Sequence, residues 1–513
     1  MTDQKQVLSR RTVVGGLSAA AVAGSFGLFA GDAQAAGPKV RSDIASTAGK
    51  KMLALYKKAA GLMAPDKKKE WDPQSWYFQA NIHCHPYLEE VSEGPSIAVT
   101  EAARAIFTQP GATAALRTLA LGADGTGSDG IWNTCSHHRD YAEHFLSWHR
   151  LYLYHFENVV QSVLGETFAM PYWNYTDPAH PEKRKLPVAF AKPAAGVVNP
   201  LHYADRDAEF LRLGLRVEDI RAKATLRDRT YLDPNENQPG FNTDIDSQPH
   251  GQVHVRIGAA GKGMQTVENA ARDPIFWVHH AQIDRLWESW RRPRISDGLS
   301  PDRDPTDQAW LDKEFTFTTP GGTPSTMQAR KALKMRQELG YTYDKLQNVK
   351  LVTLAVAQND QTGAIASTTL TQSAPNTAAT ISAKEVPVAV DITPALATDA
   401  AKAIIRKPSS QFTLVIGVEA TKNPGCVYDV FLKVKPSLNA PATEERFIET
   451  FNLFGAMHAG HGHRKPITWR ADITDLVRAS KFDPTAPGQI IVKCRFTDPI
   501  GPAVIKSVTV QAR

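Results

Sequence analysis

The segments HHRDYAEHFLSWHRLYLYHFE (residues 137–157), HGQVH (residues 250–254) and DPIFWVHHAQIDRLW (residues 273–287) carry the histidines that decide how this chain is interpreted. Together they offer two sets of imidazoles, with no Cys, Asp or Glu in the expected ligand positions. Nitrogen-only ligand sets suit transition metals that change redox state and react with dioxygen. We therefore expect a site for two copper ions.

Hydrophobic spacing divides the chain into a helical part and a strand-rich part. The stretch from His144 to Leu164 has apolar residues three and four apart and no Pro or Gly, which predicts a long buried helix. Residues 279–292, HHAQIDRLWESWRR, predict another helix that ends at Pro293. The runs FTLVIGV, VYDVFLKV and QIIVKCRF, which follow residue 411, are typical of strands. Between the two parts, residues 346–382 are rich in Ala, Thr, Ser and Gln, which indicates an exposed linker.

The N-terminus has the features of an export signal. Arg10 and Arg11 precede a Gly- and Ala-rich apolar stretch, and AQA at residues 33–35 resembles a cleavage site. The stretch is too short and too rich in small residues for a membrane anchor. We expect a twin-arginine signal peptide at residues 1–35, export to the periplasm or the exterior, and no membrane partner. The remaining expected boundaries are 36–345 for the catalytic domain, 346–382 for the linker and 383–513 for a C-terminal β domain.

Charge and cysteine usage narrow the possible partners. The net charge of +6 over 513 residues is spread along the chain, without the basic stripe of a nucleic-acid surface, so we expect no nucleic-acid partner. An exported protein can pair its cysteines, and Cys426 can reach Cys494 if the two lie in neighbouring strands. With Cys84 and Cys135, the four cysteines still allow three pairings.

The motifs resemble the type 3 copper proteins, a family that comprises tyrosinases, catechol oxidases and hemocyanins. FLSWHRLYLYHFE is similar to the helix that binds the first copper, copper A, and DPIFWVHHAQIDRLW matches the copper B signature. AWLDKEFTFTT (residues 309–319), LGYTYD (residues 339–344) and VYDVFLKV resemble the plant polyphenol oxidase arrangement, including its tyrosine motif and C-terminal β domain. The resemblance implies a mainly α catalytic domain with a four-helix core around the dicopper site, followed by a smaller β-sandwich-like domain.

The resemblance also assigns the metal ligands. It gives His250, His254 and His280 to copper B, while the neighbouring His279 is not a ligand in the family. It gives His83, His137 and His149 to copper A. The family's usual position for the second copper A ligand is occupied by Asp140 here, so His138 and His144 remain alternatives to His137, and His85 is the alternative to His83.

Cys135-Ser136-His137 resembles the fungal Cys-x-His motif, in which a thioether joins the sulfur to the ligand imidazole. A plain buried thiol is the alternative. The C-terminal histidines, His458, His461 and His463, are expected to form an exposed turn, with transient copper binding during loading as the alternative. A partner that delivers copper would fit such a role.

Three further positions bear on the reaction that the resemblance implies, the oxidation of o-diphenols to o-quinones by dioxygen. Plant enzymes hold a water with a Glu and an Asn where this chain has Asp246 and Gly251, and Val267 stands where many carry a Phe over copper B. These residues favour diphenol oxidation with weak or absent monophenol hydroxylation. The alternatives are a tyrosinase with strong monophenolase activity and hemocyanin-like dioxygen binding. A zinc hydrolase is disfavoured because Gly251 replaces the Glu of H-E-x-x-H.

Overall fold

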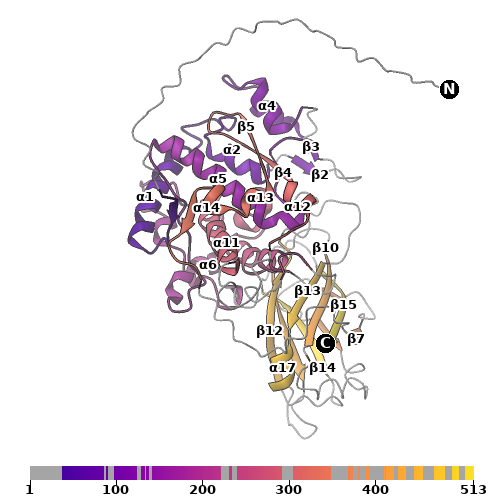
Figure 1. The fold of residues 1–513 in the computed structure, drawn as a ribbon. Coiled ribbons are helices and arrows are strands. Elements are labelled where there is room, and N and C mark those ends of the chain that lie inside the picture. The colour runs from indigo at the N-terminus through magenta and orange to yellow at the C-terminus, as the bar shows by residue number, and fades with distance from the viewer. Residues whose placement is uncertain are drawn as a thin grey trace, which may run out of the picture. The chain divides into compact units, whose positions relative to one another are not determined.

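The computed structural model describes most of the chain that follows the expected signal (Figure 1). The described residues are 37–85, 88–90, 97–123, 129–132, 134–137, 141–220, 230–233, 240–291, 304–347, 368–373, 379–381, 388–391, 410, 412–420, 426–434, 444–454, 467–479, 488–495 and 503–512. The expected signal peptide, His138, Asp140 and the three C-terminal histidines lie outside these ranges.

The part up to residue 347 is mainly helical, as predicted. Its α-helices are α1 (Thr47–Leu62), α2 (Trp76–His83), α3 (Glu101–Ile106), α4 (Ala114–Leu121), α5 (Phe145–Leu164), α6 (Ala208–Leu213), α8 (Phe241–Ile245), α9 (Gln252–Ile257), α10 (Val267–Ala270), α11 (Ile275–Arg291), α12 (Gln308–Asp312), α13 (Ala329–Ala332) and α14 (Met335–Glu338). Short helical turns are η1 (Ala142–His144), η2 (Pro181–Arg184), η3 (Val188–Phe190), η4 (Glu218–Ile220), η5 (Asp246–Gly251) and η6 (Gly263–Gln265). Short strands also occur here: β1 (Lys39–Arg41), β2 (Leu88–Glu90), β3 (Ile97–Val99), β4 (Glu314–Thr318), β5 (Pro324–Gln328) and β6 (Tyr341–Tyr343).

The two helices predicted from spacing, α5 and α11, lie against each other and are buried along most of their length. α5 ends at Gly165, whose φ of 69° is the left-handed conformation that glycine adopts without strain. Together with α2 and α9 they supply apolar side chains to one hydrophobic cluster, so that four helices surround the histidines. The prediction of a helical core is confirmed.

A buried carboxylate, Asp284 on α11, ties this core together. Its oxygens accept hydrogen bonds from Arg41 on β1 (3.0 Å), from Arg150 on α5 (2.5 Å) and from the hydroxyls of Tyr341 (2.7 Å) and Tyr343 (2.5 Å) on β6. Burial would raise the pKa of Asp284, but Arg150 and Arg41 hold it below its usual range. The tyrosine motif therefore belongs to a structural network that joins β1 and β6 to the two central helices.

The C-terminal part forms two antiparallel sheets around a second hydrophobic cluster (orange to yellow in Figure 1). Their strands are β7 (Thr368–Ser373), β8 (Ala379–Ile381), β9 (Val388–Asp391), β10 (Phe412–Ala420), β11 (Val427–Val434), β12 (Glu444–Asn452), β13 (Ile467–Asp472), β14 (Gly488–Cys494) and β15 (Ala503–Ala512), with helix α17 (Thr474–Ala479). One sheet has the order β13-β10-β15-β7, with β8 also on β15, and the other has the order β12-β11-β14-β9. Residues of both sheets share the cluster, as in a β-sandwich.

Two predictions for this part are confirmed. The runs starting at Phe412, Val427 and Gln489 lie in β10, β11 and β14. β11 and β14 are neighbours, and a disulfide joins Cys426 to Cys494, while Cys84 and Cys135 are buried and form no disulfide.

The predicted linker is too long at its C-terminal end. Thr368–Ser373 and Ala379–Ile381 form β7 and β8, which pair with β15 in register. Because these residues include few large apolar side chains, hydrophobic spacing did not reveal them. Their strand conformation depends on the backbone hydrogen bonds that β15 offers.

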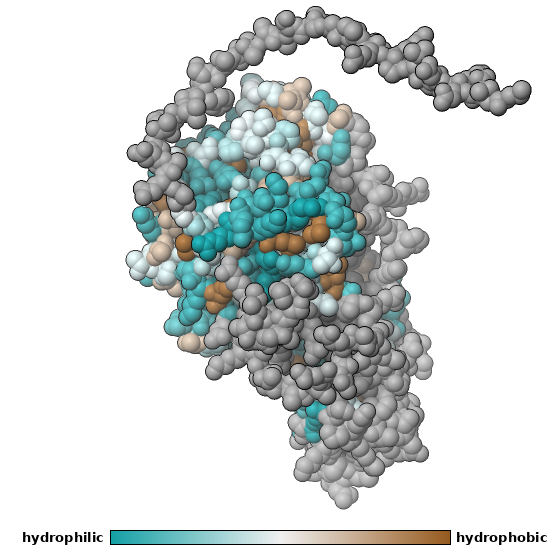
Figure 2. Space-filling view, viewed as in Figure 1, coloured by the Kyte–Doolittle hydropathy of each residue, from teal (hydrophilic) through white to brown (hydrophobic). Residues whose placement is uncertain are grey.

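Apolar surface is scattered on the face seen in Figure 2, where small brown groups lie among teal polar residues. Among the described ranges, none of the helices combines the length and the hydropathy needed to cross a bilayer.

Candidate metal centre

The first histidine cluster gathers around Cys135. His83 ends α2, His149 lies on α5, and His137 lies in the loop before η1. The Sγ atom of Cys135 is 3.3 Å from Nε2 of His83, 3.3 Å from Nδ1 of His137 and 3.8 Å from Nε2 of His149. All four side chains are buried. The structure thus brings together the three histidines that the sequence assigned to copper A.

The second cluster brings together the three histidines assigned to copper B. η5 leads directly into α9, so the rings of His250 and His254 have centroids 4.5 Å apart, as their spacing predicts. Nε2 of His254 lies 3.3 Å from Nε2 of His280 on α11. The rings of His280 and His149 stack at 4.4 Å, which places the two clusters next to each other.

Backbone carbonyls orient four of these six rings. A carbonyl only accepts hydrogen bonds, so each Nδ1 that faces one carries the proton and leaves Nε2 with its lone pair. The pairs are His83 with Val267 (3.0 Å), His149 with Phe145 (2.8 Å), His250 with Asp246 (3.0 Å) and His254 with Met264 (2.9 Å). Such hydrogen bonds fix the tautomer of a metal ligand.

Burial keeps the rings of the second cluster neutral. It lowers the pKa of His250, and it lowers the pKa of His254 and of His280 well below the ordinary value, helped by the neighbouring imidazoles. In the first cluster, burial lowers the pKa of His149 to about 4. Nε2 of His250 is buried and has no hydrogen-bond partner in the described part of the chain. Neutral, converging nitrogens with unused lone pairs fit a bound transition metal.

His137 is held differently, by Asp246. Its Nε2 lies 2.9 Å from Oδ1 of Asp246, and the same oxygen lies 2.9 Å from Nδ1 of His250. Burial alone would lower the pKa of His137, but Asp246 and Cys135 raise it well above the ordinary value. The rings of His137 and His250 stack at 5.5 Å with an interplanar angle of 5°, so Asp246 connects one ring of each cluster.

Two of the alternative ligands lie away from the clusters. His85 stacks on Trp132 at 4.7 Å, and His144 stacks on Trp310 at 4.7 Å; neither joins a cluster. His279 does lie in the second cluster, with its Nδ1 3.0 Å from the hydroxyl of Tyr175.

The other two predicted site residues lie beside the clusters. The carbonyl of Val267 accepts the hydrogen bond of His83, and its buried side chain belongs to a small cluster with Cys84, Val255, Val427 and Phe454. A Cβ atom on Gly251 would come within 2.7 Å of Oδ1 of Asn452 on β12. The role of Val267 at the substrate entrance stays a prediction.

Sequence reasoning missed two C-terminal residues at the site. The ring of Phe454 stacks on His254, with centroids 4.3 Å apart, and lies 5.6 Å from His250 and 5.7 Å from His137. Asn452 accepts a hydrogen bond from the Phe454 amide (2.9 Å) and donates one to the carbonyl of Ser247 (3.1 Å). No local motif marks either residue, because their contacts are made some two hundred residues away in sequence.

Family models match both the metal centre and the tyrosine motif. The common central domain of tyrosinase matches residues 73–209 and 191–293, and the polyphenol oxidase middle domain matches residues 304–353. The chain belongs to the tyrosinase and polyphenol oxidase family of type 3 copper proteins. Its members are oxidoreductases, and this chain is an enzyme of that type.

Curated relatives agree with this assignment. A tyrosinase of Hahella sp. (strain CCB-MM4) is 26% identical, with 79% of this chain and 84% of that protein aligned. The latent chloroplastic polyphenol oxidase of Prunus armeniaca is 28% identical over 47% of this chain, and catechol oxidase B of Solanum tuberosum is 24% identical over 65%. These alignments span only 45% and 60% of the two plant proteins.

Solved structures share the fold across both parts of the chain. Latent apple tyrosinase matches with a TM-score of 0.53 and 20% identity, over 93% of this chain and 97% of that chain. Recombinant latent aurone synthase, a polyphenol oxidase, matches with a TM-score of 0.56 and 19% identity, over 93% of this chain and 89% of that chain. The expected helical domain and C-terminal β-sandwich are thus confirmed as a fold.

The position of Cys135 leads to a first prediction, a thioether to His137. Its Sγ lies against the Nδ1 edge of that ring, where a bond to a ring carbon requires a small movement. The bond forms with loss of one hydrogen from each partner, and dioxygen takes up the two electrons. In copper-loaded, denatured protein, peptide mass spectrometry should find the two side chains joined. Cys84, the other buried cysteine outside the disulfide, is the internal control and should alkylate fully. Equal alkylation of Cys135 would disprove the bond, and a link to another histidine would change the ligand assignment.

Proposed function

We propose that the two clusters bind a pair of copper ions, with His83, His137 and His149 as ligands of copper A and His250, His254 and His280 as ligands of copper B. The observation that carries this proposal is the convergence of these six buried imidazoles, four of which have their tautomer fixed by a backbone carbonyl. The bound metals would supply the activation of dioxygen and accept the electrons of the substrate.

The protein's own residues then have distinct tasks. Carbonyl contacts prevent the ligand rings from rotating, and the apolar cluster around them excludes water. Asp246 holds His137 and His250 in parallel. The hydrogen bond of His279 to Tyr175 keeps that ring in place beside the ligands, and its assignment as a non-ligand comes from the family resemblance.

We propose o-diphenols as the preferred substrates, oxidised to o-quinones with dioxygen, with weak or absent monophenol hydroxylation. Hydroxylation needs a group that receives the proton of the phenol. Oδ1 of Asp246 is already engaged by two imidazoles, and Gly251 offers no side-chain amide that could hold a water together with Asp246. A true tyrosinase would need another base near the second cluster.

We further propose that the C-terminal domain covers the site and keeps the enzyme latent. Phe454 occupies the space over His254, His250 and His137 where a phenol would stack. Covering the site lowers the fraction of molecules that admit substrate and lowers apparent affinity by that fraction. A catalytic domain that ends near residue 345, a C-terminal domain that includes β7 and β8, export through the twin-arginine pathway to the periplasm or the exterior, and loading by a copper-delivery partner complete the proposal.

Removal of a copper B ligand tests the metal assignment. His280→Ala should reduce copper from two ions per chain to one and lower catechol oxidation by more than about a hundredfold. His144→Ala is the matched control, because His144 is a buried histidine outside both clusters, and this variant should keep both ions. Metal analysis and oxygen uptake on catechol give the two readouts. Two ions in His280→Ala, or one in His144→Ala, would contradict the assignment.

Gly251→Asn tests the substrate preference, but only after the C-terminal domain is removed. In the intact chain the new side chain would collide with Asn452 and displace β12, which would raise activity on every phenol. In the cleaved chain it should raise the ratio of tyrosine hydroxylation to oxidation of the matching diphenol by roughly tenfold or more, because an oriented water can then accept the proton. A cleaved wild-type enzyme that hydroxylates tyrosine as fast as it oxidises the diphenol would refute the proposal.

Limited proteolysis tests the latency. A cut between residues 348 and 367, followed by removal of the C-terminal domain, should raise catechol turnover without a change in copper content. If about a tenth of the molecules are open beforehand, the gain is about tenfold. Phe454→Ala should give part of this gain in the intact chain. Phe431→Ala is its control, because Phe431 lies on β11 and contacts Phe447 and Lys493. Unchanged turnover after cleavage would mean that the domain only stabilises the enzyme.

A further inference from the structure

Four charged side chains of alternating sign run from the helical part of the molecule into the C-terminal part. Nε of Arg256 lies 3.4 Å from Oδ2 of Asp219, and Oδ1 of Asp219 lies 2.7 Å from Nη1 of Arg495. Nε and Nη2 of Arg495 then donate to the two carboxylate oxygens of Asp429, at 3.2 and 2.5 Å. Arg256 and Asp219 are fully buried, and Arg495 is 5% exposed. We call these four residues the charge chain.

The two halves of the charge chain belong to different parts of the fold. Asp219 lies in η4 and Arg256 on α9, the helix that carries His254. Arg495 directly follows β14, and Asp429 lies on β11, the strand beside it. The Asp219–Arg495 pair therefore crosses from one part to the other, whereas the outer two pairs each stay within one part.

We propose that the charge chain is a separable latch that holds the C-terminal domain over the metal centre, with the Asp219–Arg495 pair as the contact that breaks on opening. This inference rests on the proposed latency and names the residues that control it. Removing one partner from a buried ion pair is costly because it leaves a charge without compensation. On opening, the charge chain would separate into the Arg256–Asp219 pair and the Arg495–Asp429 pair. Each of the four charges would then keep a partner of opposite sign, so that opening is reversible.

Hydrogen bonds connect the latch to the residue that covers the site. Nε2 of Gln252 lies between Oδ1 of Asp219 (3.4 Å) and Oγ1 of Thr450 on β12 (3.1 Å), and its Oε1 accepts a hydrogen bond from Asn452 (3.0 Å). Asn452 in turn accepts the amide of Phe454. Loss of the Asp219–Arg495 contact thus weakens the hydrogen bonds that keep Phe454 over His254. The close approach of Asn452 also requires that residue 251 have no side chain.

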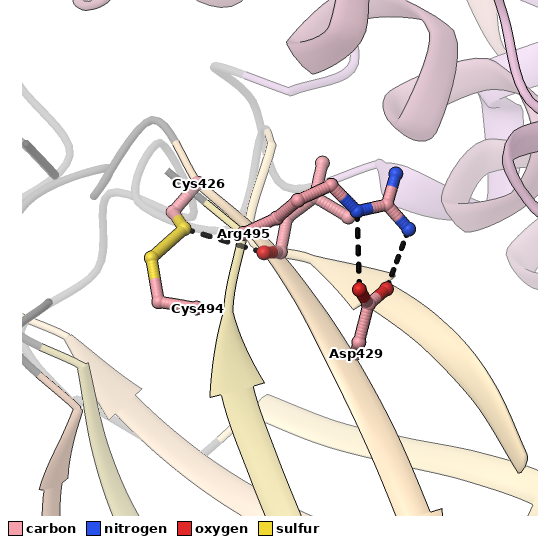
Figure 3. Close-up of a disulfide and its surroundings, with 5 residues drawn as sticks. Cys426, Asp429, Cys494 and Arg495 are labelled. Atoms are coloured by element: carbon pink, nitrogen blue, oxygen red, sulfur yellow. Dashed lines mark hydrogen bonds and ion pairs between the residues drawn. A yellow bond between two sulfur atoms is a disulfide. The ribbon is translucent and has the colours of Figure 1, made fainter. Parts of the chain in front are cut away.

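The disulfide fixes the C-terminal half of the latch in advance. Cys494 immediately precedes Arg495, and the Arg495 amide donates to the carbonyl of Val427, the residue after Cys426 (2.8 Å). Figure 3 shows the Arg495 guanidinium directed at Asp429 beside the disulfide. A side chain that is already oriented loses less freedom on docking.

Arg495 pairs with two carboxylates, Asp219 and Asp429, and replacing each in turn by the isosteric amide Asn tests the latch. In full-length, copper-loaded protein, Asp219→Asn should raise the population of the open state about tenfold or more, because it removes the contact that exists only when the domain is docked. Asp429→Asn should leave that population within about twofold and lower only the thermal stability of the β domain, since its contact persists in both states. Glu445→Gln, in the exposed ion pair with Lys493, is the control and should change neither.

Hydrogen exchange of residues 246–257 and 444–452 measures opening independently of turnover. Arg495→Met should open the chain as Asp219→Asn does, and the double variant should open it no further, because both remove one contact. Thermal unfolding verifies that each variant is folded. Equal opening in Asp429→Asn, or none in Asp219→Asn and Arg495→Met, would overturn the latch. If exchange follows the latch but removal of the domain leaves catechol oxidation unchanged, the latch stands and the proposed latency fails.

Discussion

Burying many imidazoles in an apolar helical core is the constraint on which the rest of the structure depends. A buried ring nitrogen needs a hydrogen bond or a metal, and this chain meets the requirement with carbonyl oxygens for His83, His149, His250 and His254. Two of those carbonyls belong to Val267 and Met264, in the segment between α9 and α11. The segment therefore serves both clusters at once, through hydrogen bonds that leave each Nε2 directed inward.

A second requirement is that the helices carrying these rings keep their relative positions. Asp284 fulfils it for α5 and α11, since Arg150 reaches it from α5 and lies within one turn of His149 on the same helix. Tyr341, Tyr343 and Arg41 complete its surroundings from β6 and β1. A movement of either helix would leave a buried charge unpaired, and this cost makes the core rigid near the metal centre.

The proposed substrate preference and the proposed latency both depend on one backbone position. Gly251 follows His250 directly, where a side chain would change the surroundings of the second cluster, and its bare Cα is also what permits Asn452 to approach. Asn452 then fixes the turn that carries Phe454. In a chain with a larger residue at position 251, β12 would have to pack differently against this turn. The glycine at position 251 therefore matters as much for the packing of β12 as for the surroundings of the second cluster.

The sequence by itself determined the two long helices, the β-rich C-terminal part and the set of candidate ligands, whereas it left three pairings of the four cysteines open and the structure joined Cys426 to Cys494. It did so because hydrophobic period and histidine spacing are local properties that survive in any context. Only the tertiary structure brought His83 rather than His85 into the first cluster, placed β7 and β8 in the sheet, and set Asp246 between His137 and His250. It alone brought Phe454 to the histidine clusters and Arg495 to Asp219. Those outcomes depend on contacts between residues far apart in the chain, for which no local pattern exists, because their free energy arises only when both partners are buried together.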